Sequence, residues 1–278
     1  MRGVPFIKMH GLGNDFVVID ARADVYAVDA AAARAIGDRH RGVGFDQLLM
    51  LERPRQAGAD VFMRILNTDG SEAEACGNGT RCVAYLIARE KGKERIVVET
   101  VAGLLETHAG DRNCVSVDMG EARFGWREIP LARECDTLHL PLTLGPLRDG
   151  VATNMGNPHA TFFVEDAAVV DLATIGQKLE HDPLFPERAN IGVVQLLSPT
   201  RLRFRVWERG VGITIACGSG ACAALVAAHR RGLAARRADV VADGGTLAIE
   251  WRADGHVIMA GPVAVSFTGT LDPSLLEA

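Results

Sequence analysis

Two short stretches decide the fold of this chain: Ala75-Cys76-Gly77-Asn78-Gly79 and Ala216-Cys217-Gly218-Ser219-Gly220. The cysteines are 217 − 76 = 141 residues apart, and the same offset aligns Arg64-Ile65-Leu66-Asn67 with Arg205-Val206-Trp207-Glu208 without a gap. Such a repeat predicts two half-domains of similar fold, each presenting one thiol. We expect the halves to face each other across one cleft, with a sulfur atom on each side.

The pattern around each stretch is β-rich, with a helical run after each cysteine. In the first half, strands are predicted over residues 6–9, 16–20, 47–51, 61–66, 96–100, 104–108 and 115–119, with helices over 29–36 and 80–90. In the second half, strands are predicted over 160–164, 193–197, 202–207, 240–242, 247–251, 257–259 and 263–268, with helices over 172–179 and 221–231.

This order predicts an α+β protein of two half-domains related by a pseudo-twofold axis. Each half is expected to wrap a mixed or antiparallel sheet, or a barrel, around one central helix. The expected bounds are 1–119, completed by a strand over 263–270, and 120–262. A linker is predicted between about residues 120 and 150, because Pro130, Pro141 and Pro146 interrupt any regular pattern there.

Composition indicates a soluble globular chain of 278 residues with 48% apolar and 23% charged residues. A net charge of −5 without a basic stripe argues against a nucleic-acid partner. No apolar run approaches the ~20 residues of a membrane span, and the first residues lack a secretory h-region. We therefore expect a cytoplasmic protein.

The six cysteines do not form a disulfide framework, and none has the spacing of a zinc site, so no metal is expected. Cys82 and Cys222 are predicted to be buried helix positions. Cys114 and Cys135, in ordinary contexts, are interpreted as small buried apolar residues.

Cys76 and Cys217 each precede glycines and a helical run, and a helix N-terminus lowers the pKa of a thiol from ~8.5 toward neutrality. The glycines allow a sharp turn that directs N–H groups at one point, which suits a carboxylate. Each loop can therefore offer a base and half of a carboxylate site. The alternative is that each stretch is only a tight turn with a buried cysteine. The presence of two copies at the same offset argues against this alternative.

Polar residues gather around both loops. They are Asn14, Asp15, Gln47, Asn67, Asp69, Glu72 and Asn78 in the first half, and Asn154, Asn157, His159, Asn190, Glu208 and Arg209 in the second. Asparagine beside glycine is ordinarily a turn residue, and a lone histidine at the start of a strand is often structural. At the offset of 141 residues, the charged Glu208 matches the neutral Asn67. A site that binds an asymmetric zwitterion would need such a difference between its two halves.

Taken together, these motifs resemble the diaminopimelate epimerase family. The stretches that carry the resemblance are residues 6–16 (FIKMHGLGNDF), 67–79 (NTDGSEAEACGNG), 155–159 (MGNPH), 208–212 (ERGVG) and 214–220 (TIACGSG). The resemblance implies epimerisation of LL-2,6-diaminopimelate to the meso form, without a cofactor, on the route to lysine and cell-wall peptide.

The resemblance also implies a role for each matching position. Cys76 and Cys217 match the catalytic pair, one thiolate that removes the α-proton and one thiol that returns a proton from the opposite face. His159 and Glu208 match residues that modulate the thiol pKa. The substrate-binding positions are matched by Asn14, Gln47, Asn67, Gly77, Asn78, Asn157, Asn190, Glu208, Arg209, Gly218 and Ser219.

Two departures from the family pattern are Phe45, where alanine is usual beside Gln47, and Ile213 before the second loop. The alternatives are a proline or hydroxyproline racemase, which also opposes two thiols, a single-thiol cysteine hydrolase, and a non-enzymatic binding protein for an amino acid. An exposed strand edge would favour a homodimer. The pattern does not assign either cysteine to a face of the substrate.

Overall fold

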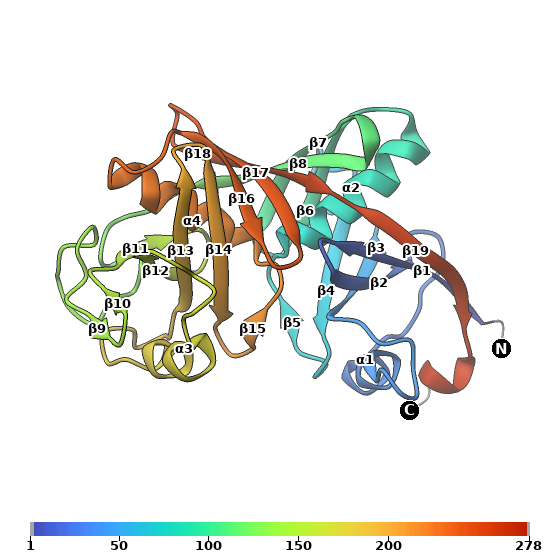
Figure 1. The fold of residues 1–278 in the computed structure, drawn as a ribbon. Coiled ribbons are helices and arrows are strands. Elements are labelled where there is room, and N and C mark those ends of the chain that lie inside the picture. Colours follow the sequence, from blue (N-terminus) through green and yellow to red (C-terminus); the bar gives the residue numbers. More distant parts are fainter. Residues whose placement is uncertain (1–2, 277–278) are drawn as a thin grey trace. The chain divides into compact units, whose positions relative to one another are not determined.

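The structure is a computed structural model, and it describes residues 3–276. The chain divides into two compact units. Unit 1 contains the residues up to Val117 and those from Gly261 onward, and unit 2 is Asp118–Ala260. Figure 1 shows that each unit combines curved strands with a long helix, which is an α+β fold as predicted.

Unit 1 is built on one mixed sheet. Its strands are β1 (Val4–Gly11), β2 (Asn14–Asp20), β3 (Gln47–Glu52), β4 (Val61–Asn67), β5 (Glu72–Ala73), β6 (Arg95–Thr100), β7 (Gly103–Ala109), β8 (Cys114–Glu121) and β19 (Ala264–Leu271), with the short helices η1 (Asp111–Asn113) and η2 (Pro273–Leu276). They pair in the order β19–β1–β2–β3–β4–β6–β7–β8, and β5 also pairs with β4. The β2–β3 and β4–β6 pairs are parallel, and the others are antiparallel.

Unit 2 repeats this topology. Its strands are β11 (Val151–Asn154), β12 (Pro158–Val164), β13 (Asn190–Ser198), β14 (Arg201–Glu208), β15 (Gly212–Thr214), β16 (Arg237–Ala242), β17 (Gly245–Trp251) and β18 (His256–Pro262), with the separate hairpin of β9 (Thr143–Leu144) and β10 (Leu147–Arg148). The order is β11–β12–β13–β14–β16–β17–β18, again with two parallel pairs, β12–β13 and β14–β16. The repeat read from the sequence is therefore a repeat of topology.

A long helix fills the core of each unit. Helix α2 (Gly77–Lys91) buries Cys82, Val83 and Ile87, and α4 (Gly218–Arg230) is buried continuously over residues 221–228. A helix that is apolar on all sides must be enclosed, and the strands around α4 enclose it. Both helices begin three residues earlier than predicted, at Gly77 and Gly218, so the cysteines themselves become the N-caps.

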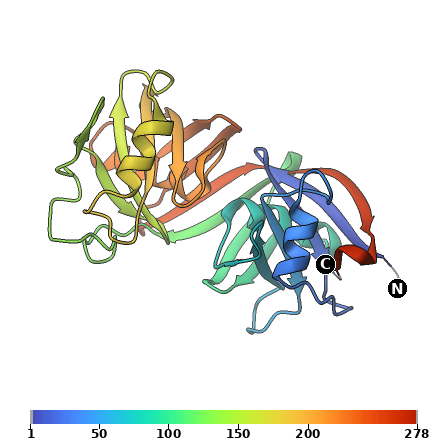
Figure 2. The ribbon, with the colours of Figure 1, turned by 90° about the horizontal axis from the view of Figure 1, so that it is seen from below.

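A second helix covers the outside of each sheet. Helices α1 (Ala30–Gly37) and α3 (Leu172–Glu180) each lie against strands of their own unit in Figure 2. Each begins at an aspartate: Asp29 accepts from two backbone N–H groups and Asp171 from one. Aspartate caps stabilise a helix by about 1 kcal/mol, and both helices were predicted from the sequence.

Two predictions are wrong. The stretch 120–150 is not a linker between the units, because it belongs to unit 2 and buries Ile129, Leu131 and Leu140 in the core of that unit. Cys114 is exposed and Cys135 is half-buried, so neither is a core residue. By contrast, Cys82 and Cys222 are fully buried as predicted.

Candidate active site

Each repeated cysteine is the N-cap of its long helix. Cys76 (φ −149°) and Cys217 (φ −124°) both have extended backbone, and the helix begins at the next residue. The first turn of a helix has backbone N–H groups without intrahelical partners. Residues Gly77 and Asn78 in α2, and Gly218 and Ser219 in α4, supply these groups, which is the arrangement that binds anions such as a carboxylate.

Matching hairpins lead into the two loops. Ile65 pairs with Ala73 between β4 and β5, and Val206 pairs with Thr214 between β14 and β15. Both members of the second pair lie 141 residues after those of the first. The hairpin places Asn67 at the end of β4 and Glu208 at the end of β14, so the substitution within the repeat falls at the same place in each unit.

The environment of the first thiol is polar on its helix side. Cys76 is half-buried, and its Sγ accepts a hydrogen bond from Gly79 N–H at 3.3 Å. An N–H group directed at sulfur from a helix N-terminus stabilises the thiolate relative to the thiol. Gly79 also leaves little space beside the sulfur, because a Cβ there would lie 3.2 Å from the methyl groups of Leu49 and 3.5 Å from Sγ.

The second thiol is buried and lies beside a carboxylate. Cys217 is 5% exposed. Burial raises the pKa of its thiol well above the ordinary value, and the negative charge of Glu208 raises it further. Gly220 N–H and the Ser219 hydroxyl, 3.7 Å from Sγ, act in the opposite direction. The prediction that the helix N-terminus lowers the pKa of both thiols is therefore wrong for Cys217, because desolvation outweighs the helix.

His159 reaches the second loop through Ser219. Its Nε2 lies 2.8 Å from Asn157 Oδ1 and 3.1 Å from Ser219 Oγ. Because Oδ1 only accepts, the hydrogen of the neutral imidazole is on Nε2. Burial lowers the pKa of His159 to about 3, and the charge of Arg209 contributes in the same direction. His159 is therefore a neutral donor that orients Asn157 and Ser219.

The turn after β14 carries the charged pair. The Thr214 hydroxyl donates to the Glu208 carboxylate. Asn190, itself 2% exposed, accepts from Arg209 N–H at 2.9 Å and donates to the Pro158 carbonyl at 3.0 Å. Asn190 thus ties the charged turn to the strand that carries His159.

In unit 1, amide side chains form two pairs. Gln47 Nε2 donates to Asn67 Oδ1 at 3.0 Å across the β3–β4 register. Asn78 Nδ2 donates to Asn14 Oδ1 at 3.1 Å, so the loop of Cys76 is joined to the start of β2. The side chains that match the substrate-binding positions in unit 1 are thus neutral amides that pair with one another, whereas the turn of unit 2 carries charged side chains.

Two supporting residues near these amides were not predicted. Asp46 accepts from Asn14 Nδ2 at 2.9 Å and forms an ion pair with Arg39 at 2.8 Å. Arg81, fully buried in α2, donates to Asn78 Oδ1 at 2.7 Å. Asp46 lies beside the predicted Gln47, so the sequence held a weak signal for it, whereas nothing in the pattern marks a buried arginine.

Contacts connect many of the predicted site residues within each unit. In unit 1, Gly77 and Asn78 follow Cys76 in the chain, and hydrogen bonds join Asn78 to Asn14 and Gln47 to Asn67. In unit 2, Gly218 and Ser219 follow Cys217, Glu208 lies beside that thiol, and hydrogen bonds join His159 to Asn157 and Ser219, and Asn190 to Arg209. Within residues 3–276, no cluster of three or more His, Cys, Asp or Glu side chains could hold a metal ion. In the same range, no helix is both long enough and apolar enough to span a membrane.

Sequence relatives identify the family. Residues 6–125 and 151–266 match the family model described as diaminopimelate epimerase. This chain belongs to the diaminopimelate epimerase family. The resemblance drawn from the motifs is therefore confirmed.

Individual relatives agree with this assignment over nearly the full length. The diaminopimelate epimerase of Acidiphilium cryptum is 60% identical over 272 residues, which cover 98% of each chain. That of Rhodospirillum centenum is 60% identical over 271 residues, covering 98% of this chain and 93% of the relative.

Solved structures that are more distant in sequence share the fold. A hydroxyproline epimerase from Agrobacterium vitis superposes with a TM-score of 0.70 at 15% identity, covering 99% of this chain and 96% of the other. A methylitaconate-delta-isomerase gives a TM-score of 0.66 at 14% identity, with coverage of 99% and 97%. At these identities the similarity concerns the fold alone.

Phe45, one of the two departures from the diaminopimelate epimerase pattern, packs away from the polar group. It is buried in the apolar cluster beneath α1. A Cβ on Gly37, the last residue of α1, would lie 3.0 Å from the Phe45 ring. The larger side chain is thus accommodated by a glycine at the helix end, and Gln47 keeps its partner Asn67.

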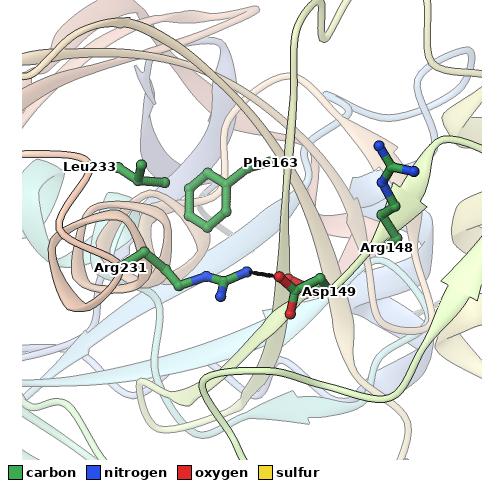
Figure 3. Close-up of a pocket in the computed structure, with 5 residues that line it drawn as sticks. All are labelled: Arg148, Asp149, Phe163, Arg231 and Leu233. Carbon is green, nitrogen blue, oxygen red and sulfur yellow. Dashed lines mark hydrogen bonds and ion pairs between the residues drawn. The ribbon is translucent and has the colours of Figure 1, made fainter.

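Unit 2 also has a hollow of about 390 Å³. It is lined by Arg148, Asp149, Phe163, Arg231 and Leu233, which are drawn in Figure 3. Arg231 and Asp149 form an ion pair across it. None of the predicted site residues lines this hollow. It is therefore separate from the group around Cys217.

Proposed function

We propose that this chain epimerises LL-2,6-diaminopimelate to meso-diaminopimelate by a two-base mechanism without a cofactor, in lysine and peptidoglycan precursor synthesis. The observation that carries the proposal is the duplicated N-cap cysteine in two unequal settings. Inverting one carbon requires a base on one face and an acid on the other. Two thiols held in different protonation states meet that requirement.

The surroundings of the two sulfur atoms favour Cys76 as the base and Cys217 as the acid in the direction from LL to meso. Gly79 N–H donates to Cys76 Sγ and stabilises a thiolate there. Burial and Glu208 keep Cys217 as a thiol. Cys76 removes the α-proton, Cys217 gives its proton to the opposite face, and the reverse reaction exchanges the roles.

The first turns of α2 and α4 supply the electrostatic stabilisation. The α-proton of an amino acid is weakly acidic, and negative charge develops on the adjacent carboxylate as the proton leaves. We assign the N–H groups of Gly77, Asn78, Gly218 and Ser219 to that carboxylate. A well-placed donor of this kind contributes about 3 kcal/mol to transition-state stabilisation.

The unreactive end of the substrate is a second amino acid group, so its receptor needs both charges. Glu208 supplies a carboxylate for its ammonium group and Arg209 a guanidinium for its carboxylate. The amides of Asn14, Gln47, Asn67, Asn157 and Asn190 supply further hydrogen bonds. A proline-type substrate lacks this second end and has no use for the charged pair.

We also propose a cytoplasmic homodimer. The mechanism requires both cysteines in the reduced state, which a reducing compartment maintains. Strand β19 presents Val265 and Phe267, which are 44% and 50% exposed. Light scattering should give twice the chain mass, and Phe267→Asp should give the chain mass. A wild-type protein with the mass of one chain at micromolar concentration would contradict the dimer.

Incubation of the purified protein with LL-diaminopimelate under reducing conditions tests the function. Chiral chromatography should show the meso isomer, with no turnover of L-proline or trans-4-hydroxy-L-proline in the same assay. The absorption spectrum should contain no band beyond the protein's own ultraviolet absorption. Turnover of proline instead of diaminopimelate, or a bound chromophore required for activity, would contradict the proposal.

A further inference from the structure

Glu180, the last residue of α3, has a buried carboxylate that the sequence patterns do not mark. It is 2% exposed, and both of its oxygens accept hydrogen bonds. Trp207 Nε1–H donates to Oε2 at 2.6 Å, and Gly210 N–H donates to Oε1 at 2.8 Å. These two donors flank Glu208 and Arg209 in the chain. One carboxylate therefore holds both ends of the charged segment.

The backbone between the two donors forms a tight turn. Val211 N–H donates to the Glu208 carbonyl at 3.1 Å, and Gly210 has a φ of +74°. Glu208 and Arg209 therefore occupy the first two positions of a β-turn whose third position favours glycine. The Gly210 N–H at this third position is not used by the turn, and Glu180 accepts it.

Close packing of α3 brings Glu180 within reach of this turn. A Cβ on Gly176 would lie 2.6 Å from Cβ of Trp207, so only glycine permits the observed approach of α3 to β14. The nearest cationic group to the carboxylate is Arg188, whose Nη1 lies 3.7 Å from Oε1. A carboxylate at a helix C-terminus is disfavoured by the helix dipole, and its burial costs further free energy. A favourable interaction that offsets this free-energy cost is therefore expected, and the hydrogen bonds from Trp207 and Gly210 provide it.

We propose that Glu180 is a positioning residue that, by holding this turn, sets the direction of the Arg209 side chain toward the unreactive end of the substrate. This inference rests on the proposed function. The Glu208 carboxylate beside Cys217 is held separately by the Thr214 hydroxyl, and Glu180 does not contact the reacting carbon. Its loss should therefore weaken substrate binding more than it slows the chemical step.

Glu180→Gln is the direct test, because a glutamine keeps the shape but has a single acceptor oxygen for two donors. The expected result is a KM for LL-diaminopimelate that is about tenfold higher, the size of one lost buried hydrogen bond, with kcat within about threefold of wild type. Trp207→Phe removes one of the two donors and should raise KM in the same direction. In the double variant, the two effects should be less than additive.

Glu99→Gln is the matched control. Glu99 in unit 1 is buried to a similar degree and accepts from two backbone N–H groups, those of Arg55 and Gln56. This variant should lower the melting temperature while KM stays at the wild-type value. An unchanged KM in Glu180→Gln, or an equal rise in Glu99→Gln, would overturn the positioning role.

The wild-type enzyme in the same assay separates the two proposals. Failure of wild type to epimerise LL-diaminopimelate would overturn the proposed function and, with it, this role for Glu180. Wild-type activity with a fall in kcat alone in Glu180→Gln would leave the function standing and overturn the positioning role.

Discussion

The loops of Cys76 and Cys217 share their backbone and differ in what surrounds the sulfur. Both cysteines are N-caps, and both lie after a hairpin of the same register. A backbone N–H group of the first helical turn acts on each sulfur, that of Gly79 on Cys76 and that of Gly220 on Cys217, but Cys76 is half-buried whereas Cys217 is buried beside Glu208. The repeat thus places each thiol at the same position of its unit, and burial together with Glu208 raises the pKa of Cys217.

The largest expected effect comes from removing either thiol. Cys76→Ser and Cys217→Ser should each lower kcat for LL-diaminopimelate by roughly 10²- to 10⁴-fold, the usual range for a positioned general acid or base. Steady-state assays in both directions provide the measurement. If one variant kept near wild-type activity, the two loops would not be partners in one reaction, as a single-thiol hydrolase would require.

The second prediction concerns His159, whose counterpart in the sheet register of unit 1 is Phe16. Because burial lowers its pKa from 6.5 to about 3, the unfolded chain takes up a proton below pH 6.5 and the folded chain does not. The free energy of unfolding therefore has its full value above pH 6.5 and decreases as the pH falls from 6.5 toward 3. Between pH 7 and pH 5, this loss amounts to about 2 kcal/mol.

Urea unfolding at the two pH values measures this loss. The variant His159→Gln should lose less stability than wild type over the same interval, by about that amount. Identical pH dependence in wild type and variant would show that His159 is not held neutral in the folded state.

Alanine at matching glycines gives a third test. A Cβ at Gly220 would lie 2.8 Å from the buried Phe204 ring and 3.2 Å from Cys217 Sγ, a closer fit than at Gly79. Overpacking costs about 1–3 kcal/mol, so Gly220→Ala should be destabilised and less active. In Gly79→Ala, the neighbouring Leu49 methyl groups can move, and the gain in helix propensity of about 1 kcal/mol offsets the contact. The measurement is the melting temperature of each variant relative to wild type. An equal decrease in the two variants would contradict the difference in packing.

The smallest effect is a difference in thiol reactivity. At pH 7.5, iodoacetamide should modify Cys76 at least about tenfold faster than Cys217, because alkylation requires an accessible thiolate. Peptide mass spectrometry distinguishes the sites. Cys82, fully buried with its pKa raised to about 12, serves as the unreactive internal reference. Faster modification of Cys217 would reverse the proposed acid and base roles.

Much of the fold followed from local pattern. The long helices were predicted because apolar residues recur at helical spacing after each cysteine, and the strands because short β-rich runs end at glycine. The buried 120–150 segment was missed, since its leucines are spaced irregularly between prolines. The position of Cys114 at the exposed start of β8 also depends on tertiary packing that residue type does not specify.

The site was predicted where a motif marked it and missed where distant chain segments meet. The loop residues Asn78 and Ser219 lie beside the cysteines in the sequence, so the motifs marked them. Glu180 accepts a hydrogen bond from Trp207, which is distant in the chain, and no motif marks Glu180. Arg81 was missed for another reason, because a buried arginine three residues after Asn78 cannot be told from an exposed one by its type. The raised pKa of Cys217 also could not be predicted, because desolvation is a property of the folded core.

The most direct test of the two-thiol account is to follow label from solvent. LL-diaminopimelate is incubated with the enzyme in heavy water, and both isomers are recovered at low conversion. With one thiol on each face, the meso product should carry one deuterium at the inverted carbon, and the recovered LL isomer should remain unlabelled. Deuterium entering the recovered LL isomer as fast as the product, or meso product without deuterium, would contradict the account.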